Sequence, residues 1–271
     1  MQAKSKIDAA QLRDRLERGA KEIEIHTESH ILPTERQIAE ARALLNEYDA
    51  KIVAIHLPIV NKRATTLTDI LNNPEELIRW AIHVPLLTDG ECSIVIHNDI
   101  KIDMPLNVLF SRGTRHLHHL LKNNPKLSID IENSMQMVHP VTLSDTAELI
   151  TWLRGNISPN FNGLLDTCHM YSDMFESNQP GYPADLYAFL PLTKRIHLSD
   201  CKGDGMLSNQ HGRVFESQSK LNDMLDHIYT INPNTKYCFE VQEEDYTSSN
   251  NYSAMCDMFT QYKAKETRQC N

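Results

Sequence analysis

Apolar positions recur along the chain in two alternating patterns. Short runs rich in Ile, Val and Leu, such as residues 51–59 (KIVAIHLPI) and 92–96 (CSIVI), have the length and the β-branched content of buried strands. Between such runs, apolar residues recur every three or four positions, which is the period of an amphipathic helix. The pattern predicts strands over residues 22–27, 51–59, 92–96, 126–131, 161–165, 195–198 and 236–241, and helices over residues 8–18, 33–48, 68–87, 105–121, 143–153, 183–190, 219–229 and 252–263. We expect the helix over 68–87 to break near Pro74 and to end at Pro85.

This alternation predicts a series of parallel β/α units. Strand and helix alternate about seven times at a spacing of roughly 35 to 40 residues, with no obvious linker. One continuous series of this length favours a closed TIM-type β/α barrel, spanning residues 1–271 as one domain, over a doubly wound sheet. An eight-stranded barrel needs a strand before the first helix, and residues 1–7 offer only a poor one. The sequence therefore predicts a first strand that is missing or degenerate.

Composition narrows the class of protein. A chain of 271 residues with 41% hydrophobic content can bury a large core. It contains no apolar run long enough for a transmembrane helix, its N-terminus is too polar for a signal peptide, and its cysteines show no CxxC pairing. We expect a cytoplasmic protein with reduced thiols. The net charge of −9 argues against a broad cationic nucleic-acid surface, but it allows a local basic groove or carboxylates neutralised by bound cations.

Carboxylates and imidazoles stand at the ends of the predicted strands. In a parallel barrel these ends lie on one rim, where catalytic groups gather. The residues at or just beyond the ends are His56, His97, Glu132, Asp166, His169, His197 and Glu240. Such side chains are suited to Zn²⁺, Mn²⁺ or a related ion, and clustered carboxylates without cations would resist joint ionisation. The sequence predicts a divalent-metal centre. Two close metals would suit phosphodiester hydrolysis, and one would suit polarisation of a sugar carbonyl.

Several segments carry a resemblance to a known family. They are AIHLP (54–58), VIH (95–97), IEN (131–133), LDTCH (165–169), HLSDCKG (197–203), NQHGRVFE (209–216) and FEV (239–241). In these segments the chain resembles the xylose isomerase-like barrels and, within them, the endonuclease IV type of apurinic/apyrimidinic endonuclease (AP endonuclease family 2).

The resemblance implies which residues would bind each of up to three metal ions. It implies that Glu132 bridges two ions. His56 and His97 would complete the coordination of the first ion. Asp166, His197 and Glu240 would complete that of the second. His169 and His211 would hold a third. The implied activity is hydrolysis of the phosphodiester at abasic sites in damaged DNA, with two or three zinc ions.

The chain also departs from the endonucleases. Asn209 stands where they carry an aspartate ligand to the third metal, and of their Gly-Glu-Gly only Glu216 remains. Their N-terminal strand, with its histidine and glycine-rich turn, has no evident counterpart. These departures affect the third metal and, with it, abasic-site cleavage. Asp200 is expected to orient a histidine and not to bind metal.

Two other functions stay open. The single-metal sugar isomerases and epimerases of the same superfamily use Glu, Asp, His and Glu at four strand ends, matched here by Glu132, Asp166, His197 and Glu240. In that alternative Mn²⁺ or a similar single ion is expected, the two glutamates form an acid/base pair, and His169 contacts a sugar or sugar phosphate. His56 and His97 would then only line the pocket. The third alternative is a non-catalytic metal-binding barrel.

Overall fold

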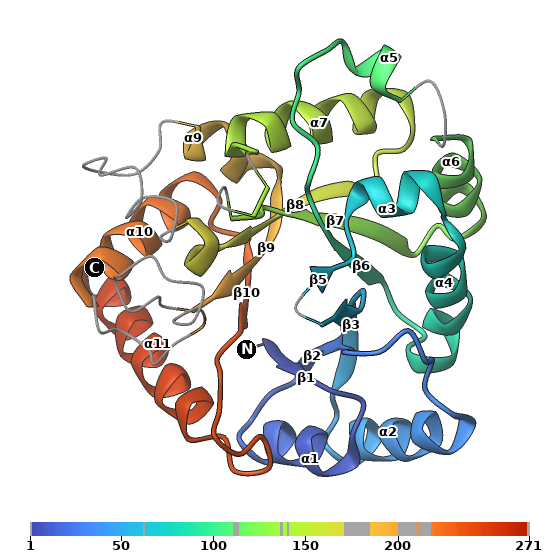
Figure 1. Cartoon of the computed structure of the whole chain (residues 1–271). Helices are drawn as coiled ribbons and strands as arrows, with labels where there is room; N and C mark the ends of the chain where they lie inside the picture. The colour runs from blue at the N-terminus through green and yellow to red at the C-terminus, as the bar shows by residue number, and fades with distance from the viewer. Residues whose placement is uncertain are drawn as a thin grey trace.

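Eight parallel strands close into a barrel in the computed structural model, which describes residues 2–61, 63–110, 114–135, 138–139, 141–170, 185–199, 211 and 218–269 (Figure 1). The strands, in their order around the barrel, are β1 (Gln2–Ser5), β10 (Lys236–Phe239), β9 (Thr193–Leu198), β8 (Phe161–Asp166), β7 (Leu127–Glu132), β6 (Cys92–His97), β3 (Lys51–His56) and β2 (Glu22–His26). A separate antiparallel pair, β4 (Ile59–Val60) and β5 (Arg63–Ala64), follows β3. The predicted TIM-type barrel is confirmed.

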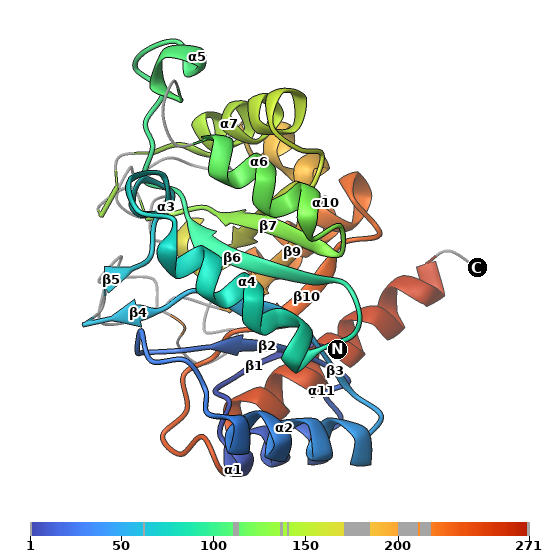
Figure 2. The ribbon, with the colours of Figure 1, turned by 90° about the vertical axis from the view of Figure 1, so that its right-hand side faces the viewer.

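Helices surround the barrel on its outer side (Figures 1 and 2). They are α1 (Ala9–Glu17), α2 (Glu35–Glu47), α3 (Leu67–Asn72), α4 (Glu75–Leu87), α5 (Leu106–Leu109), α6 (Thr114–Asn123), α7 (Leu143–Asn156), α9 (Leu186–Phe189), α10 (Gln218–Ile231) and α11 (Asn250–Gln269), with a 3₁₀ turn η1 at Leu190–Leu192. Most of the buried apolar side chains form one cluster between the strands and these helices. Among the described residues, no helix has the length and apolar character needed to span a membrane.

The first strand of the barrel is present, so the prediction of a missing or degenerate strand was wrong. In β1, Gln2 and Ala3 pair in parallel with β10, and all four residues pair in parallel with β2. The strand lacks an apolar run because Gln2 and Lys4 pair with polar groups of the barrel: Gln2 donates to Glu22, and Lys4 donates to Glu240. Because these side chains face polar groups inside the barrel, a search for apolar runs does not detect the strand.

Local chemistry explains several of the helix ends. The Asp8 carboxylate caps α1 by accepting from two backbone amides, and Thr34 and Gln37 form a capping box at α2. The segment predicted over 68–87 divides before Pro74 into α3 and α4, as expected. Pro85, however, lies inside α4 and does not end it. The helix continues past Pro85 and lacks only the hydrogen bond that an amide at this position would donate to the Ala81 carbonyl.

Two glycines provide a matched test of the packing. A Cβ at Gly163 in β8 would lie 2.8 Å from a ring carbon of the fully buried Phe189, whereas a Cβ at Gly155 in α7 would meet nothing within 4 Å. Gly163→Ala is therefore expected to destabilise the protein by about 1–3 kcal/mol. Gly155→Ala is expected to stabilise it by roughly 0.5–1 kcal/mol, because alanine favours the helix. Urea denaturation of both variants checks the pair, and a Gly163→Ala midpoint at or above that of Gly155→Ala would contradict it.

Candidate metal centre

The barrel brings the predicted strand-end residues together. All barrel strands end on one side of the molecule, the side on which β4 and β5 lie (Figure 2). Two of the groups whose ligand atoms lie within 4.8 Å of one another consist of these predicted residues. The first group is His56, His97 and Glu132, and the second is Glu132, Asp166, His197 and Glu240. Their role as metal ligands stays a prediction, but their placement is the one that the strand ends indicated.

Glu132 belongs to both groups. Its Oε2 lies 3.2 Å from His56 Nε2, 3.6 Å from His97 Nε2 and 3.5 Å from His197 Nδ1. The carboxylate is buried at the end of β7. The ring of His56 is oriented by a 2.8 Å hydrogen bond between its Nδ1 and the Leu57 carbonyl, which turns Nε2 toward Glu132. One carboxylate is thus within reach of two adjacent cations.

The second group contains buried polar atoms that no hydrogen bond satisfies. These are Oδ2 of Asp166, Nδ1 of His197 and Oε2 of Glu240. Nδ1 of His197 lies only 2.7 Å from Glu240 Oε2, yet neither atom is in a hydrogen bond. A buried polar atom left in this way costs about 1–3 kcal/mol. Three such atoms around one point present lone pairs to a cation, so the residues fit a divalent ion.

Burial and neighbouring charge set the ionisation of the centre. Burial lowers the pKa of His97 to about 3, so its imidazole is neutral, as a metal ligand must be. Burial alone would raise the pKa values of Glu132 and Glu240. For Glu132 this is outweighed by His97 and His197, and for Glu240 by Lys4 and His211, so both pKa values fall well below the usual range. Both glutamates are therefore ionised.

His169 and His211, the histidines implied for a third metal, lie side by side with ring centroids 5.6 Å apart. Nδ1 of His169 lies 2.9 Å from the Asn133 carbonyl and 3.4 Å from Glu132 Oε1. Burial lowers the pKa of His169, but the charges of Asp166 and Glu132 outweigh it and raise the value above normal. His211 forms a candidate group with Asp166 and Cys168. The other predicted members of this region, Asn209, Asp200 and Glu216, lie outside the described residues.

The sequence-based prediction missed Lys4 and Glu24, which also reach the centre. Lys4 Nζ lies 2.6 Å from Glu240 Oε1, and Glu24 contacts His197. Burial alone would raise the pKa of Glu24, yet His197, Lys4 and Arg195 bring it down to about 2. One signal was available for Glu24: it alternates with the apolar Ile23 and Ile25 of β2, so it faces the opposite side of the strand.

Comparison with known proteins places the fold. No protein-family model matches the sequence, and no curated protein matches it. Among solved structures, the chain is similar to a xylose isomerase domain protein from Planctomyces limnophilus (TM-score 0.68, 13% identity, 98% of this chain and 96% of that chain). It is also similar to endonuclease IV from Thermus thermophilus (TM-score 0.61, 13% identity, 97% and 98%) and to D-psicose 3-epimerase from Clostridium cellulolyticum (TM-score 0.54, 12% identity, 93% and 89%).

The fold is therefore a TIM barrel similar to that of the xylose isomerase domain protein and of endonuclease IV, as the sequence pattern indicated. The structures that this chain resembles are mostly enzymes and include an endonuclease and an epimerase. At 12–16% identity they establish the fold and leave the particular activity to the chemistry of the site.

Proposed function

We propose that this protein is a divalent-metal-dependent hydrolase that cleaves phosphodiesters with two or three zinc ions, in the manner of endonuclease IV, with DNA containing abasic sites as substrate. The observation that carries the proposal is the position of Glu132 between two groups of candidate ligands. Two ions joined by one carboxylate can hold the attacking and the leaving oxygen of an in-line displacement. A sugar isomerase needs only the group around Asp166.

The number of bound ions decides whether the charge of the centre suits an anionic substrate. Arg195 pairs with Asp130 below the site. The remaining charged groups are Lys4 and the carboxylates of Glu24, Glu132, Asp166 and Glu240. With the histidines neutral, as they must be when they bind metal, these groups leave a net charge of about −3. One divalent ion therefore leaves the centre negative, and two make it positive. A phosphodiester suits the second state and a neutral sugar the first.

Each protein group then has a definite task. His56, His97 and Glu132 would coordinate the first ion, and Glu132, Asp166, His197 and Glu240 would coordinate the second. Lys4 holds Oε1 of Glu240 and so directs Oε2 toward His197 Nδ1. Bound ions would polarise the phosphoryl oxygens and make a water acidic enough to attack. His169 and His211, next to Asp166, are the groups that would hold a third ion or contact the phosphate.

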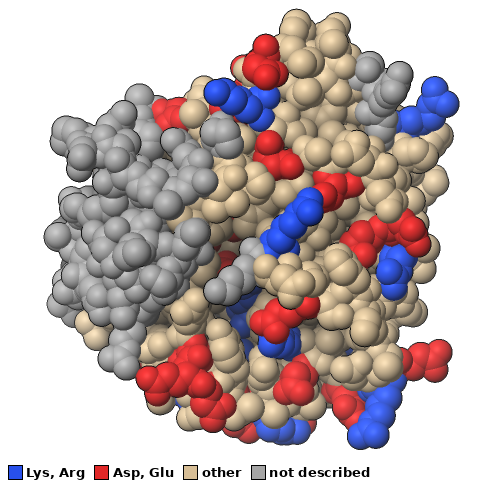
Figure 3. Space-filling view, in the orientation of Figure 1, with Lys and Arg blue, Asp and Glu red and all other residues tan. Residues whose placement is uncertain are grey.

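A metal-dependent sugar or sugar-phosphate isomerase or epimerase is the second candidate. The assembled group of Glu132, Asp166, His197 and Glu240 favours it, because that group is the full single-metal set. Acidic and basic side chains are interspersed on the described part of the face seen in Figure 3, which has no continuous basic surface for DNA. One observation argues against the isomerase: Glu240 would have to lose its hydrogen bond from Lys4 before it could serve as an acid/base group. The non-catalytic barrel remains the third alternative.

Metal analysis and one cleavage assay test the proposal. We expect two or three zinc ions per chain and single-strand cleavage of a duplex with one abasic site. His197→Ala should lower cleavage by on the order of a thousandfold, because it removes several kcal/mol of transition-state stabilisation. His116→Ala, an exposed position on α6, is the matched control and should leave cleavage unchanged.

Three outcomes would contradict the hydrolase. One ion per chain together with isomerisation of a ketose would support the second candidate. Cleavage that survives His197→Ala would show that this site does not cleave DNA. Absence of bound metal and of activity on both substrate classes would support the non-catalytic barrel.

A further inference from the structure

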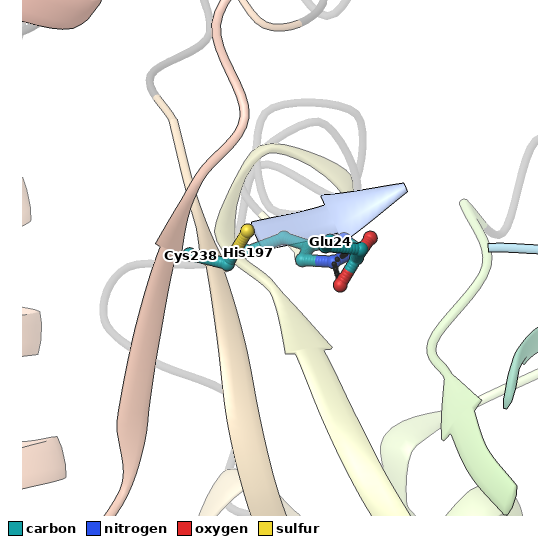
Figure 4. Close-up of side chains that lie close together, drawn as sticks. All are labelled: Glu24, His197 and Cys238. Carbon is teal, nitrogen blue, oxygen red and sulfur yellow. Dashed lines mark hydrogen bonds and ion pairs between the residues drawn. The ribbon is translucent and has the colours of Figure 1, made fainter. Parts of the chain in front are cut away.

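The two ring nitrogens of His197 face different partners. Nδ1 points to the metal centre, where it lies 3.5 Å from Glu132 Oε2 and 2.7 Å from Glu240 Oε2. Nε2 lies on the other side of the ring, 2.9 Å from Oε1 and 3.0 Å from Oε2 of Glu24 (Figure 4). A neutral imidazole carries one proton, and the hydrogen bond that this proton makes decides which nitrogen is free to bind a metal.

The surroundings of Glu24 fix its position, so this carboxylate can select the tautomer of His197. Its side chain is completely buried in the barrel at β2. Two cations lie next to it: Lys4 Nζ is 3.8 Å from Oε1, and Arg195 Nη1 is 3.6 Å from Oε2. Both cations have further partners, Glu240 for Lys4 and Asp130 for Arg195, which fix their positions. Glu24 is thus an ionised acceptor whose place is set by the barrel interior.

Glu24, His197 and Cys238 also present ligand atoms within 4.8 Å of one another, so a separate metal at this group has to be weighed (Figure 4). The surroundings disfavour it. A divalent ion there would stand beside the ammonium of Lys4 and the guanidinium of Arg195. It would also compete with the Nε2 proton of His197 for the same carboxylate. The group therefore serves the neighbouring centre better as a support than as a site of its own.

We propose that Glu24 is the positioning residue of the metal centre: it accepts the Nε2 proton of His197 and thereby keeps Nδ1 unprotonated and directed at the metal. The inference rests on the proposed metal centre and adds a residue from β2, a strand that contributes none of the expected ligands. Partners of this kind fix both the tautomer and the ring orientation of a metal-binding histidine. Their loss weakens metal binding typically by 10-fold to 100-fold.

Zinc affinity and the His197 tautomer test the inference directly. Zinc alone is titrated into metal-stripped protein against a competing chelator. Glu24→Gln is expected to weaken binding by roughly 10-fold to 100-fold. Proton–nitrogen spectra of histidine-labelled protein, assigned through His197→Ala, should show Nε2–H for His197 in the wild type and loss or mixing of this tautomer in Glu24→Gln.

Glu22→Gln is the matched control, since Glu22 lies two residues earlier on the same strand and contacts Gln2 and Lys51 in place of His197. It should bind zinc within about twofold of the wild type. If Glu24→Gln fails to fold by circular dichroism, Glu24→Asp keeps the charge but shortens the reach, and weakened binding is again expected. Wild-type affinity with an unchanged His197 tautomer in a folded Glu24 variant would overturn the inference.

Neither readout depends on the substrate. The inference therefore survives if abasic DNA is not cleaved but Glu24→Gln still weakens zinc binding. Conversely, if the wild type cleaves abasic DNA but Glu24→Gln binds zinc as tightly as the wild type does, the inference about Glu24 is wrong and the proposed function is not affected.

Discussion

Glu132→Gln is expected to remove both ions of the centre and to lower phosphodiester cleavage by at least about a thousandfold. The reason is geometric: Oε2 of Glu132 lies close to ligand nitrogens of both groups, at 3.2 Å from His56 and 3.5 Å from His197. An amide keeps the shape of the side chain but lacks the charge that each ion requires. Metal analysis after dialysis, together with cleavage of an abasic-site duplex, measures the two effects.

Two further variants make this result specific. Asp166→Asn alters the second group and the neighbouring group of Asp166, Cys168 and His211, so it should leave the first ion, at His56, His97 and Glu132, in place. Glu148→Gln changes an exposed carboxylate on α7 and should change neither quantity. Retention of the wild-type number of ions in Glu132→Gln would contradict a shared carboxylate, and equal losses in Glu132→Gln and Asp166→Asn would indicate one site.

Hydrophobic patterning was sufficient for most of the barrel. Strands such as β3 and β6 are apolar runs because they are buried on both faces, toward the helices and toward the barrel interior. The same rule failed for β1, where Gln2 and Lys4 enter a polar interior that no local pattern reveals. Whether a strand faces polar or apolar neighbours inside a barrel depends on strands far away in sequence, here Glu240 of the C-terminal part.

In the candidate site, too, some features could be predicted from the sequence and others could not. His56, Glu132 and His197 were predictable because a parallel barrel carries every strand end to one rim, whatever the loops do. The support of His197 by Glu24 was not, because it joins strands β2 and β9 across the barrel. Sequence periodicity shows that Glu24 faces the side of the strand opposite to Ile23 and Ile25, but only the closed barrel shows which residue it meets.

Arg195→Met is expected to destabilise the metal-free protein by about 3–5 kcal/mol, the usual consequence of removing one partner from a buried ion pair. The guanidinium is almost fully buried, and it donates to Asp130, to Gln2 and to the Val53 carbonyl. Without it, the buried carboxylates of Asp130 and Glu24 lose a neighbouring cation and stay buried without that partner. Thermal and urea unfolding in the presence of a chelator measure this loss apart from metal binding.

A surface variant and a double variant show whether burial is the cause. Arg36→Met breaks an ion pair with Glu40 on the exposed side of α2 and should leave the unfolding midpoint where it is, since water and salt screen such pairs. Adding Asp130→Asn to Arg195→Met should recover part of the loss, because the orphaned carboxylate is then neutral. If Arg195→Met shifted the midpoint no more than Arg36→Met does, this buried network would contribute little to the fold. The ligand-bearing strands β7 and β9 would then be held in place by their backbone hydrogen bonds to β8 and by apolar packing.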